Sequence, residues 1–137
     1  MCTSLRMVNR SISRLYDGAL SEAGIRVTGY SILSRLAQEG PLSMGKLAGR
    51  LAMERTTCTR EVAPLVDAGL VEITVGADRR TRMLQLTDLG ARKRAEAYPL
   101  WERAQRMLAD EFGDDDIATL LERLRRLQAG SDRLSRS

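Results

Sequence analysis

A helix rich in threonine and arginine constrains the fold of this chain more than any other feature. Within residues 55–68, Cys58, Val62 and Leu65 recur at the spacing of one helix face, so this face should be buried. Pro64 removes one backbone donor and predicts a kink near Arg60. Small hydroxyl, methyl and guanidinium groups occupy the other face, at Thr56, Thr59, Arg60 and Ala63. Such side chains can reach both phosphates and base edges of a duplex, although an ordinary solvated helix face remains the alternative.

Two alternating segments follow this helix and predict a hairpin. Val71, Ile73 and Val75 alternate with polar residues, the chain turns at 76–80, and the alternation resumes through Leu86. Before the helix, Ser43 is placed to cap a short helix over residues 44–51, and Thr28 is placed to cap the helix that precedes it, which should end at Gly40. Two short helices followed by a hairpin with arginines at its tip predict a helix-turn-helix with a wing.

The turn and the segment after it carry a family resemblance. Asp78-Arg79-Arg80, followed by Leu84-Gln85-Leu86-Thr87-Asp88-Leu89-Gly90, resembles the wing signature of the MarR family of bacterial transcription regulators. The resemblance covers nearly the whole chain. It implies a mainly α (α+β) fold, in which a winged helix-turn-helix lobe lies between terminal helices that form a dimerisation region. It also implies a homodimer that binds double-stranded DNA with a palindromic operator.

The resemblance assigns roles to particular residues. The wing arginine would enter the minor groove, whose negative potential attracts arginine, and Asp78 would brace the loop by an ion pair. Lys46 and Ser43 would contact phosphates, although for Lys46, Arg50 and Arg82 a plain surface role is also open. The expected DNA-binding residues are Arg55, Thr56, Thr57, Thr59 and Arg60 in the recognition helix and Asp78, Arg79, Arg80 and Arg82 in the wing.

Helices with narrow apolar stripes are expected at both ends of the chain. A helix over 5–20 and a long one from Thr87 to about Phe112, bent or interrupted at Pro99, precede a last helix capped by Asp114. The tail from Gly130 should fray. We expect one domain over 1–137, with the lobe at 28–87 and the dimerisation helices at 5–20 and 88–130. The expected interface residues are Val8, Ile12, Leu120, Leu121, Leu124 and Leu127; an intramolecular bundle is the alternative.

The resemblance also raises the question of a sensed signal. Related regulators bind phenolic or other aromatic effectors, and Arg14, Tyr16, Tyr30 and Trp101 could form such a pocket; the alternative is that the three aromatic side chains belong to the core. Cys58 should be a small buried residue. Cys2 should lie in a mobile terminus, outside the first helix. Some related regulators sense peroxides through a cysteine in the first helix, so these two positions do not favour a thiol switch. A thiol-based redox sensor of the same fold is the alternative function.

Composition excludes other classes of protein. The formal charge of +4 permits nucleic acid binding but does not prove it. The chain has no histidine, no nucleophile–base pair and no glycine-rich phosphate loop, so we expect neither an enzyme nor a cofactor or metal site. It shows no signal peptide and no membrane span, which predicts a cytoplasmic protein. We therefore predict a homodimeric repressor relieved by a ligand, or alternatively a winged-helix protein-interaction module that does not bind DNA.

Overall fold

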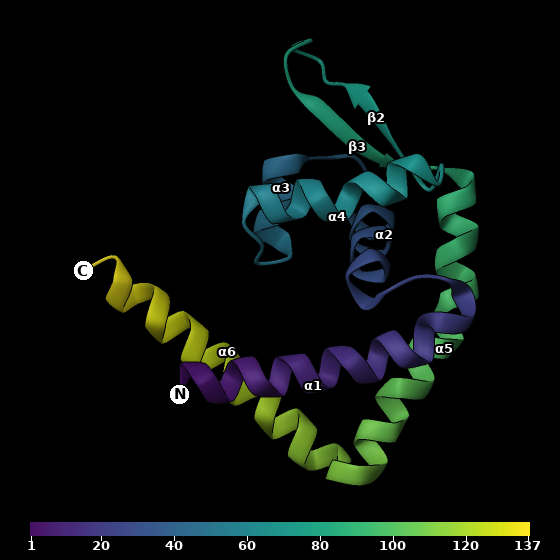
Figure 1. Ribbon diagram of the computed structural model, residues 1–137. Coiled ribbons are helices and arrows are strands. Elements are labelled where there is room, and N and C mark those ends of the chain that lie inside the picture. Colours follow the sequence, from purple (N-terminus) through teal and green to yellow (C-terminus); the bar gives the residue numbers. More distant parts are fainter. The chain divides into compact units, whose positions relative to one another are not determined.

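The computed structural model describes all 137 residues, which form two compact units, Met1–Trp101 and Glu102–Ser137. Helices dominate, and the three short strands form one antiparallel sheet in the order β1-β3-β2 (Figure 1). The mainly α prediction is therefore confirmed. In chain order the elements are α1 (Cys2–Leu20), a 3-10 helix (Ser21–Ala23), α2 (Val27–Glu39), β1 (Leu42–Ser43), α3 (Met44–Arg50), α4 (Arg55–Asp67), β2 (Val71–Val75), β3 (Arg82–Leu86), α5 (Asp88–Phe112) and α6 (Asp114–Ser135).

The joint between α1 and α2 is closed by a side chain that the sequence analysis did not single out. Asp17 in α1 accepts a hydrogen bond of 2.8 Å from the backbone N–H of Val27, the first residue of α2. It also pairs with Arg26 at 3.6 Å. A carboxylate at the amino end of a helix satisfies a free donor and suits the helix dipole. Asp17 thus caps α2 from ten residues upstream.

The core of the first unit gathers apolar side chains from most of its elements. Its fully buried members come from α1, α2, α3, α4 and the sheet: Leu20, Ile32, Leu33, Leu36, Leu47, Cys58, Val62, Val71 and Leu84. In α4 the predicted buried stripe of Cys58, Val62 and Leu65 is confirmed. Pro64 lies inside this helix, which continues through it to Asp67. The helix therefore presents its opposite face outward over its full length.

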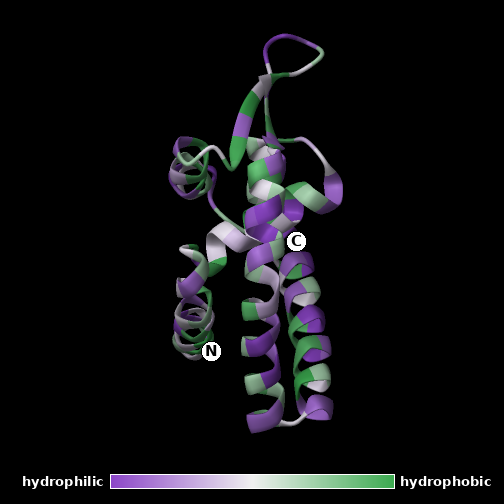
Figure 2. Ribbon diagram, turned by 90° about the vertical axis from the view of Figure 1, so that its right-hand side faces the viewer, coloured by the Kyte–Doolittle hydropathy of each residue, from purple (hydrophilic) through white to green (hydrophobic).

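The hairpin is short and projects from the sheet (Figure 1). Its strands pair in register from Val71 opposite Leu86 to Val75 opposite Arg82, and Leu42 of β1 pairs with Leu84 on the other edge of β3. Of the alternating residues in β2 only the first is buried, and the later ones are exposed because nothing covers the outer part of the hairpin. Hydrophilic colour marks part of its tip in Figure 2.

The start of α5 explains the spacing of threonine and glycine after the hairpin. Thr87 donates from its hydroxyl to the carbonyl of Gly69 at 2.6 Å and accepts from the N–H of Gly90 at 3.0 Å. A Cβ atom on Gly90 would lie 2.1 Å from the carbonyl oxygen of Leu70. Only glycine fits this close approach, which fixes the end of the hairpin to the first turn of α5.

Several predicted element boundaries are wrong. Thr28 does not cap α2, because Arg26 occupies the cap position and Asp17 supplies the acceptor. Asp114 does not cap α6; Gly113, at φ 95°, precedes it. The segment after Gly130 does not fray, because α6 continues to Ser135 with hydroxyl groups of Ser131 and Ser135 bonded to carbonyls one turn earlier.

The long helix α5 lacks the interruption that Pro99 could have caused. Helix α5 spans Asp88–Phe112 as one element with Pro99 inside it, so proline does not interrupt it. None of the helices combines the length and the apolar character needed to cross a bilayer. The predicted division into a lobe at 28–87 and dimerisation helices at 5–20 and 88–130 stays a prediction.

Candidate nucleic-acid interface

The exposed face of α4 is a continuous polar surface. Thr56, Thr59 and Arg60 are exposed, and Thr57 is half-buried beside them. Together with Arg55 and Ala63, the first three line a shallow groove of about 570 Å³. Thr59 donates its hydroxyl proton to the carbonyl of Arg55 at 2.9 Å, so it meets a ligand as an acceptor. The geometry therefore brings together the helix residues that the sequence analysis proposed.

A second groove joins this helix to the hairpin. It measures about 610 Å³ and is lined from three sides, by Ser43 and Gly45 of the β1–α3 corner, by Arg55 and Thr59 of α4, and by the hairpin. The hairpin contributes Ile73, Arg80, Thr81, Arg82 and Leu84. Three arginines from two elements thus border one hollow, and none of them forms an ion pair within the chain. Unpaired guanidinium groups around a groove suit an anionic ligand such as a phosphate backbone.

The predicted ion pair of Asp78 is wrong, because hydrogen bonds brace the loop instead. Its carboxylate accepts from the backbone N–H of Arg80 at 3.1 Å, from the N–H of Thr81 at 2.9 Å and from the hydroxyl of Thr81 at 2.8 Å. The bonds from Thr81 and then from Arg80 hold the pKa of Asp78 below its usual value. Arg79, at φ 60°, completes the tight turn. The arginine side chains at the tip remain available.

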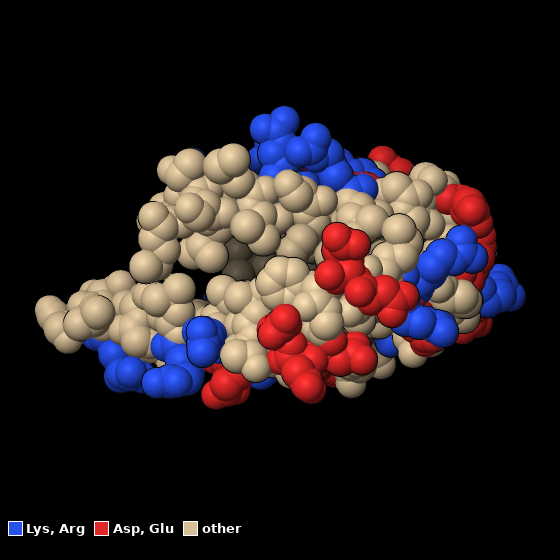
Figure 3. Space-filling model, turned by 90° about the horizontal axis from the view of Figure 1, so that it is seen from below, with Lys and Arg blue, Asp and Glu red and all other residues tan.

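Unlike the arginines around the groove, two arginines near the end of α2 pair with a carboxylate. Glu39 at the end of α2 accepts hydrogen bonds from Arg50 at 2.9 Å and from Arg35 at 3.3 Å. These contacts, chiefly the one with Arg50, lower the pKa of Glu39. Arg50 therefore has an acidic partner on α2, and its phosphate contact stays a prediction. Lys46, which was predicted to contact phosphate, is exposed and forms no ion pair, and its backbone N–H is bonded to Ser43 at 3.2 Å. Figure 3 shows one group of basic side chains at the edge of this face and basic and acidic side chains next to one another elsewhere.

The three aromatic residues predicted for an effector pocket stack on one another. Trp101 stacks on Tyr16, Tyr30 and Tyr98, with ring centroids 5.8–6.3 Å apart. Tyr16 and Tyr30 are buried, and burial raises the pKa of Tyr16. Arg14 is exposed. This packing fits the alternative in which the aromatic side chains belong to the core, and the effector role stays a prediction.

The two cysteines differ in their surroundings. Cys58 is 0% exposed, and burial, with a smaller effect of nearby Glu61, raises the pKa of its thiol. A raised pKa leaves little reactive thiolate near neutral pH. Cys2 is exposed and free, and it is the first residue of α1. The expectation that no cysteine lies inside the first helix is therefore wrong.

Most of the predicted interface residues are exposed in the single chain. Val8 is 51% exposed and Ile12 is half-buried on α1. On α6, Leu120, Leu121, Leu124 and Leu127 are 36–46% exposed, and no residue of that helix is buried.

Asp17 and Glu39, which order the joints around α2, were not found by sequence reasoning because their partners come from other elements.

Comparisons with known proteins show what this chain is similar to. The family model described as the MarR family matches residues 25–81. The uncharacterised HTH-type transcriptional regulator YwoH of Bacillus subtilis is 26% identical over 107 residues, which are 78% of each chain.

Two solved structures extend the likeness over almost the whole chain. The transcriptional regulator MosR of M. tuberculosis, in complex with DNA, is 29% identical with a TM-score of 0.86, covering 97% of this chain and 96% of that one. The PcaV regulator of Streptomyces coelicolor, in complex with its natural ligand, is 22% identical with a TM-score of 0.82, covering 93% and 90%. The second likeness shows the shared fold.

Proposed function

We propose that this chain is a MarR-family transcription regulator that binds double-stranded DNA in a sequence-specific way. The observation that carries the proposal is the groove between α4 and the hairpin. Arg55, Arg80 and Arg82 converge on it without any carboxylate partner, next to the exposed threonine-rich face of α4. The DNA complex of MosR, whose fold this chain shares, supports the same ligand.

The shape of this surface suggests how a duplex would lie on it. The major groove is wide enough to admit an α-helix, so the exposed face of α4 would lie in it, where Arg60 could donate two hydrogen bonds to guanine. The groove behind it would take the sugar-phosphate backbone, with Arg55 and Arg82 as donors. The hairpin would follow the adjacent minor groove, and the bonded Asp78 loop would hold Arg80 ready without a cost in ordering.

We propose that the active form is a homodimeric repressor on a palindromic operator. The exposed leucines of α6 and the exposed apolar side chains of α1 need cover, which a second copy supplies. Two lobes related by a two-fold axis would read half-sites about one helical turn apart. Release by a small aromatic effector is part of the proposal; the PcaV regulator, which has the same fold, was solved in complex with its natural ligand.

Other functions are less well supported by the surface. An enzyme would need a nucleophile with a base, and the candidate surface holds hydroxyls and arginines without such a pair. A module that binds protein alone would not need three unpaired arginines around one groove. A thiol sensor acting through Cys58 conflicts with the burial of its sulfur.

The test is a salt titration of Arg60→Ala and Arg80→Ala on a specific duplex and on a scrambled one. Arg60→Ala should lose about 1–3 kcal/mol of discrimination at one position in each half-site. Arg80→Ala should weaken binding to both duplexes and reduce the slope of log K against log salt by about one per half-site. Arg10→Ala, an exposed arginine of α1, is the control for loss of charge. If both variants bind like the unmutated protein, this surface does not read DNA.

A further inference from the structure

An acidic side chain lies at the end of α2, where a helix favours it least. Glu39 is the last residue of α2, and the last turn of this helix contains no basic residue. The carboxyl end of a helix carries the negative end of its dipole, so a carboxylate there is destabilising. Two arginines offset this effect, because one oxygen of Glu39 accepts from Nη1 of Arg35 at 3.3 Å and the other accepts from Nε of Arg50 at 2.9 Å. The shorter bond joins α2 to another helix, α3.

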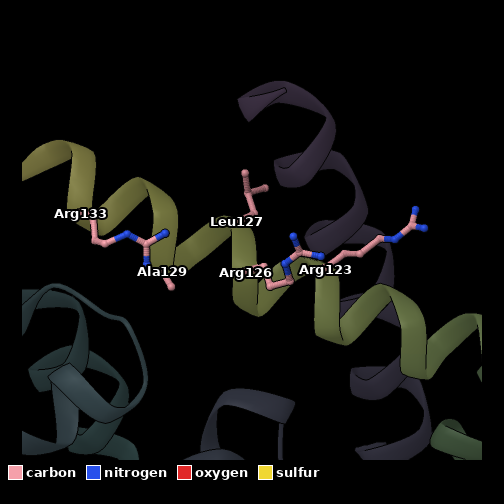
Figure 4. A pocket seen from close by; sticks show the side chains of 5 residues that line it. All are labelled: Arg123, Arg126, Leu127, Ala129 and Arg133. Atoms are coloured by element: carbon pink, nitrogen blue, oxygen red, sulfur yellow. The ribbon is translucent and has the colours of Figure 1, made fainter.

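Exposed arginines of this chain do not find a carboxylate as a matter of course. Arg123, Arg126 and Arg133 of α6 line a hollow of about 390 Å³, and no acidic side chain is among the lining residues that Figure 4 shows. None of these three arginines forms an ion pair, and the arginines around the groove between α4 and the hairpin form none either. The acidic partner of Arg50 therefore needs an explanation of its own.

Arg50 lies where a contact with phosphate would be useful. It follows Lys46 by four residues, so the two exposed side chains share one side of α3, while Leu47 and Ala48 of this helix are buried. Gly45, near the other end of α3, lines the groove that we assign to the sugar-phosphate backbone. Five residues of helix separate it from Arg50, or about 7.5 Å. Helix α3 thus presents two basic side chains beside this groove, and only the second is paired with an acid.

The ion pair is open to exchange with a phosphate. The side chain of Arg50 is 51% exposed and that of Glu39 is 27% exposed, and exposed pairs hold their partners weakly. A guanidinium binds phosphate and carboxylate with the same fork of donors. The exchange has a cost, however, because Glu39 would then keep only Arg35 and would lie close to the phosphate that displaced it. Arg50 therefore contributes less to binding than an arginine without an acidic partner.

We propose that Glu39 limits the sequence-independent part of DNA binding by holding Arg50 against α2. This role, which rests on the proposed function, opposes binding instead of supporting it. Glu39 acts through Arg50 and is a positioning residue. Phosphate contacts carry no base information, so the limit applies to every duplex. A regulator that binds arbitrary sequences less tightly is occupied less by the many competing sites of a genome.

A salt titration of Glu39→Gln tests this role, because the amide keeps the size of the side chain and removes its charge. On a duplex of random sequence the variant should bind at least about threefold more tightly at about 0.1 M salt. The slope of log K against log salt should become steeper by about one per lobe, as one additional phosphate contact requires. Asp67→Asn is the matched control and should leave the slope unchanged, because Asp67 is the exposed last residue of α4 and forms no ion pair.

Two further variants separate the release of Arg50 from a change in overall charge. Arg50→Ala alone should change the slope less than Arg80→Ala does, because Glu39 already engages Arg50. Added to Glu39→Gln, Arg50→Ala should abolish the steeper slope. A steeper slope that persists without Arg50 would overturn the proposal, as would an unchanged slope in Glu39→Gln. Weaker binding of Glu39→Gln together with a lower melting temperature would make the pair a structural link only, and would overturn it as well.

The same titration distinguishes this failure from failure of the proposed function. If Arg80→Ala reduces the slope while Glu39→Gln leaves it unchanged, the role of Glu39 is wrong and the DNA-binding surface stands. If Arg60→Ala and Arg80→Ala both bind like the unmutated protein, the DNA-binding surface itself is wrong, whatever Glu39→Gln does.

Discussion

The winged part of the first unit buries its apolar side chains, whereas helix α6 leaves its apolar side chains exposed. From α2 to β3, each helix and the paired strands place at least one side chain in a common core, and Leu33, Leu47 and Val62 are almost completely buried. Helix α6 is also rich in leucine, yet none of its residues is buried. The winged part has a buried core of its own, while α6 has an apolar face that no element of its unit covers.

The contrast teaches that the same periodic pattern has two meanings. In α4 the stripe of Cys58, Val62 and Leu65 faces inward, and the polar face is free to bind a ligand. In α6 the apolar stripe itself is the free surface. A stripe on α4 therefore marks the side away from the proposed function, and a stripe on α6 marks the proposed functional side.

The largest effect is expected from breaking the apolar face of α6. Leu124→Asp would put a carboxylate from each copy into the dimer contact without a partner, which costs far more than losing a leucine. The dimer dissociation constant should rise by at least about a thousandfold, or about 4 kcal/mol. Sedimentation equilibrium measures it, with Thr119→Asp as the control for added charge. An unmutated chain that is monomeric at micromolar concentration would contradict the contrast between the two regions.

A smaller effect is expected from creating a cavity in the core of the first unit. Leu33→Ala removes a side chain that is 0% exposed and should lower the free energy of unfolding by about 2–5 kcal/mol. The loss should be the same at every protein concentration, because the cavity lies inside one chain. Urea unfolding monitored by circular dichroism at two concentrations measures this. A concentration-dependent loss would show that the core is not complete in one chain.

The smallest effect is expected at the tip of the hairpin. Asp78→Ala removes three hydrogen bonds of the loop and should weaken duplex binding less than Arg80→Ala does, because the binding arginine remains. The pKa of Asp78 is lowered in the folded state, so its contribution is complete above the ordinary aspartate pKa and is lost as the pH falls through the folded value. Carbon-13 titration of the carboxyl group measures this pKa. An unshifted value would contradict the brace.

Much of the fold could be predicted because it depends on short-range patterns. The buried stripe of α4, the cap at Ser43 and the hairpin at 71–86 follow from periodicity, capping chemistry and turn residues. The threonine and glycine at positions 87 and 90 could be recognised as a signature. Their reason became visible only when Gly90 was seen against the carbonyl of Leu70.

The errors occurred where a residue acts on a distant part of the chain. Thr28 has the chemistry of a cap, but Asp17 from another helix takes that role. Asp78 was expected to pair with an arginine, whereas nearer backbone donors satisfy it. Local sequence cannot rank partners whose distances are set by packing.

The sequence by itself determined which residues alternate, which carry charge and where the chain turns, since these depend on neighbours within a few positions. It therefore determined the order of elements and the candidate DNA-binding residues. Only the tertiary structure decided which arginines remain unpaired around the groove and which apolar faces are covered. Both depend on contacts between elements far apart in the sequence, and a pattern along one helix cannot show whether another element covers it.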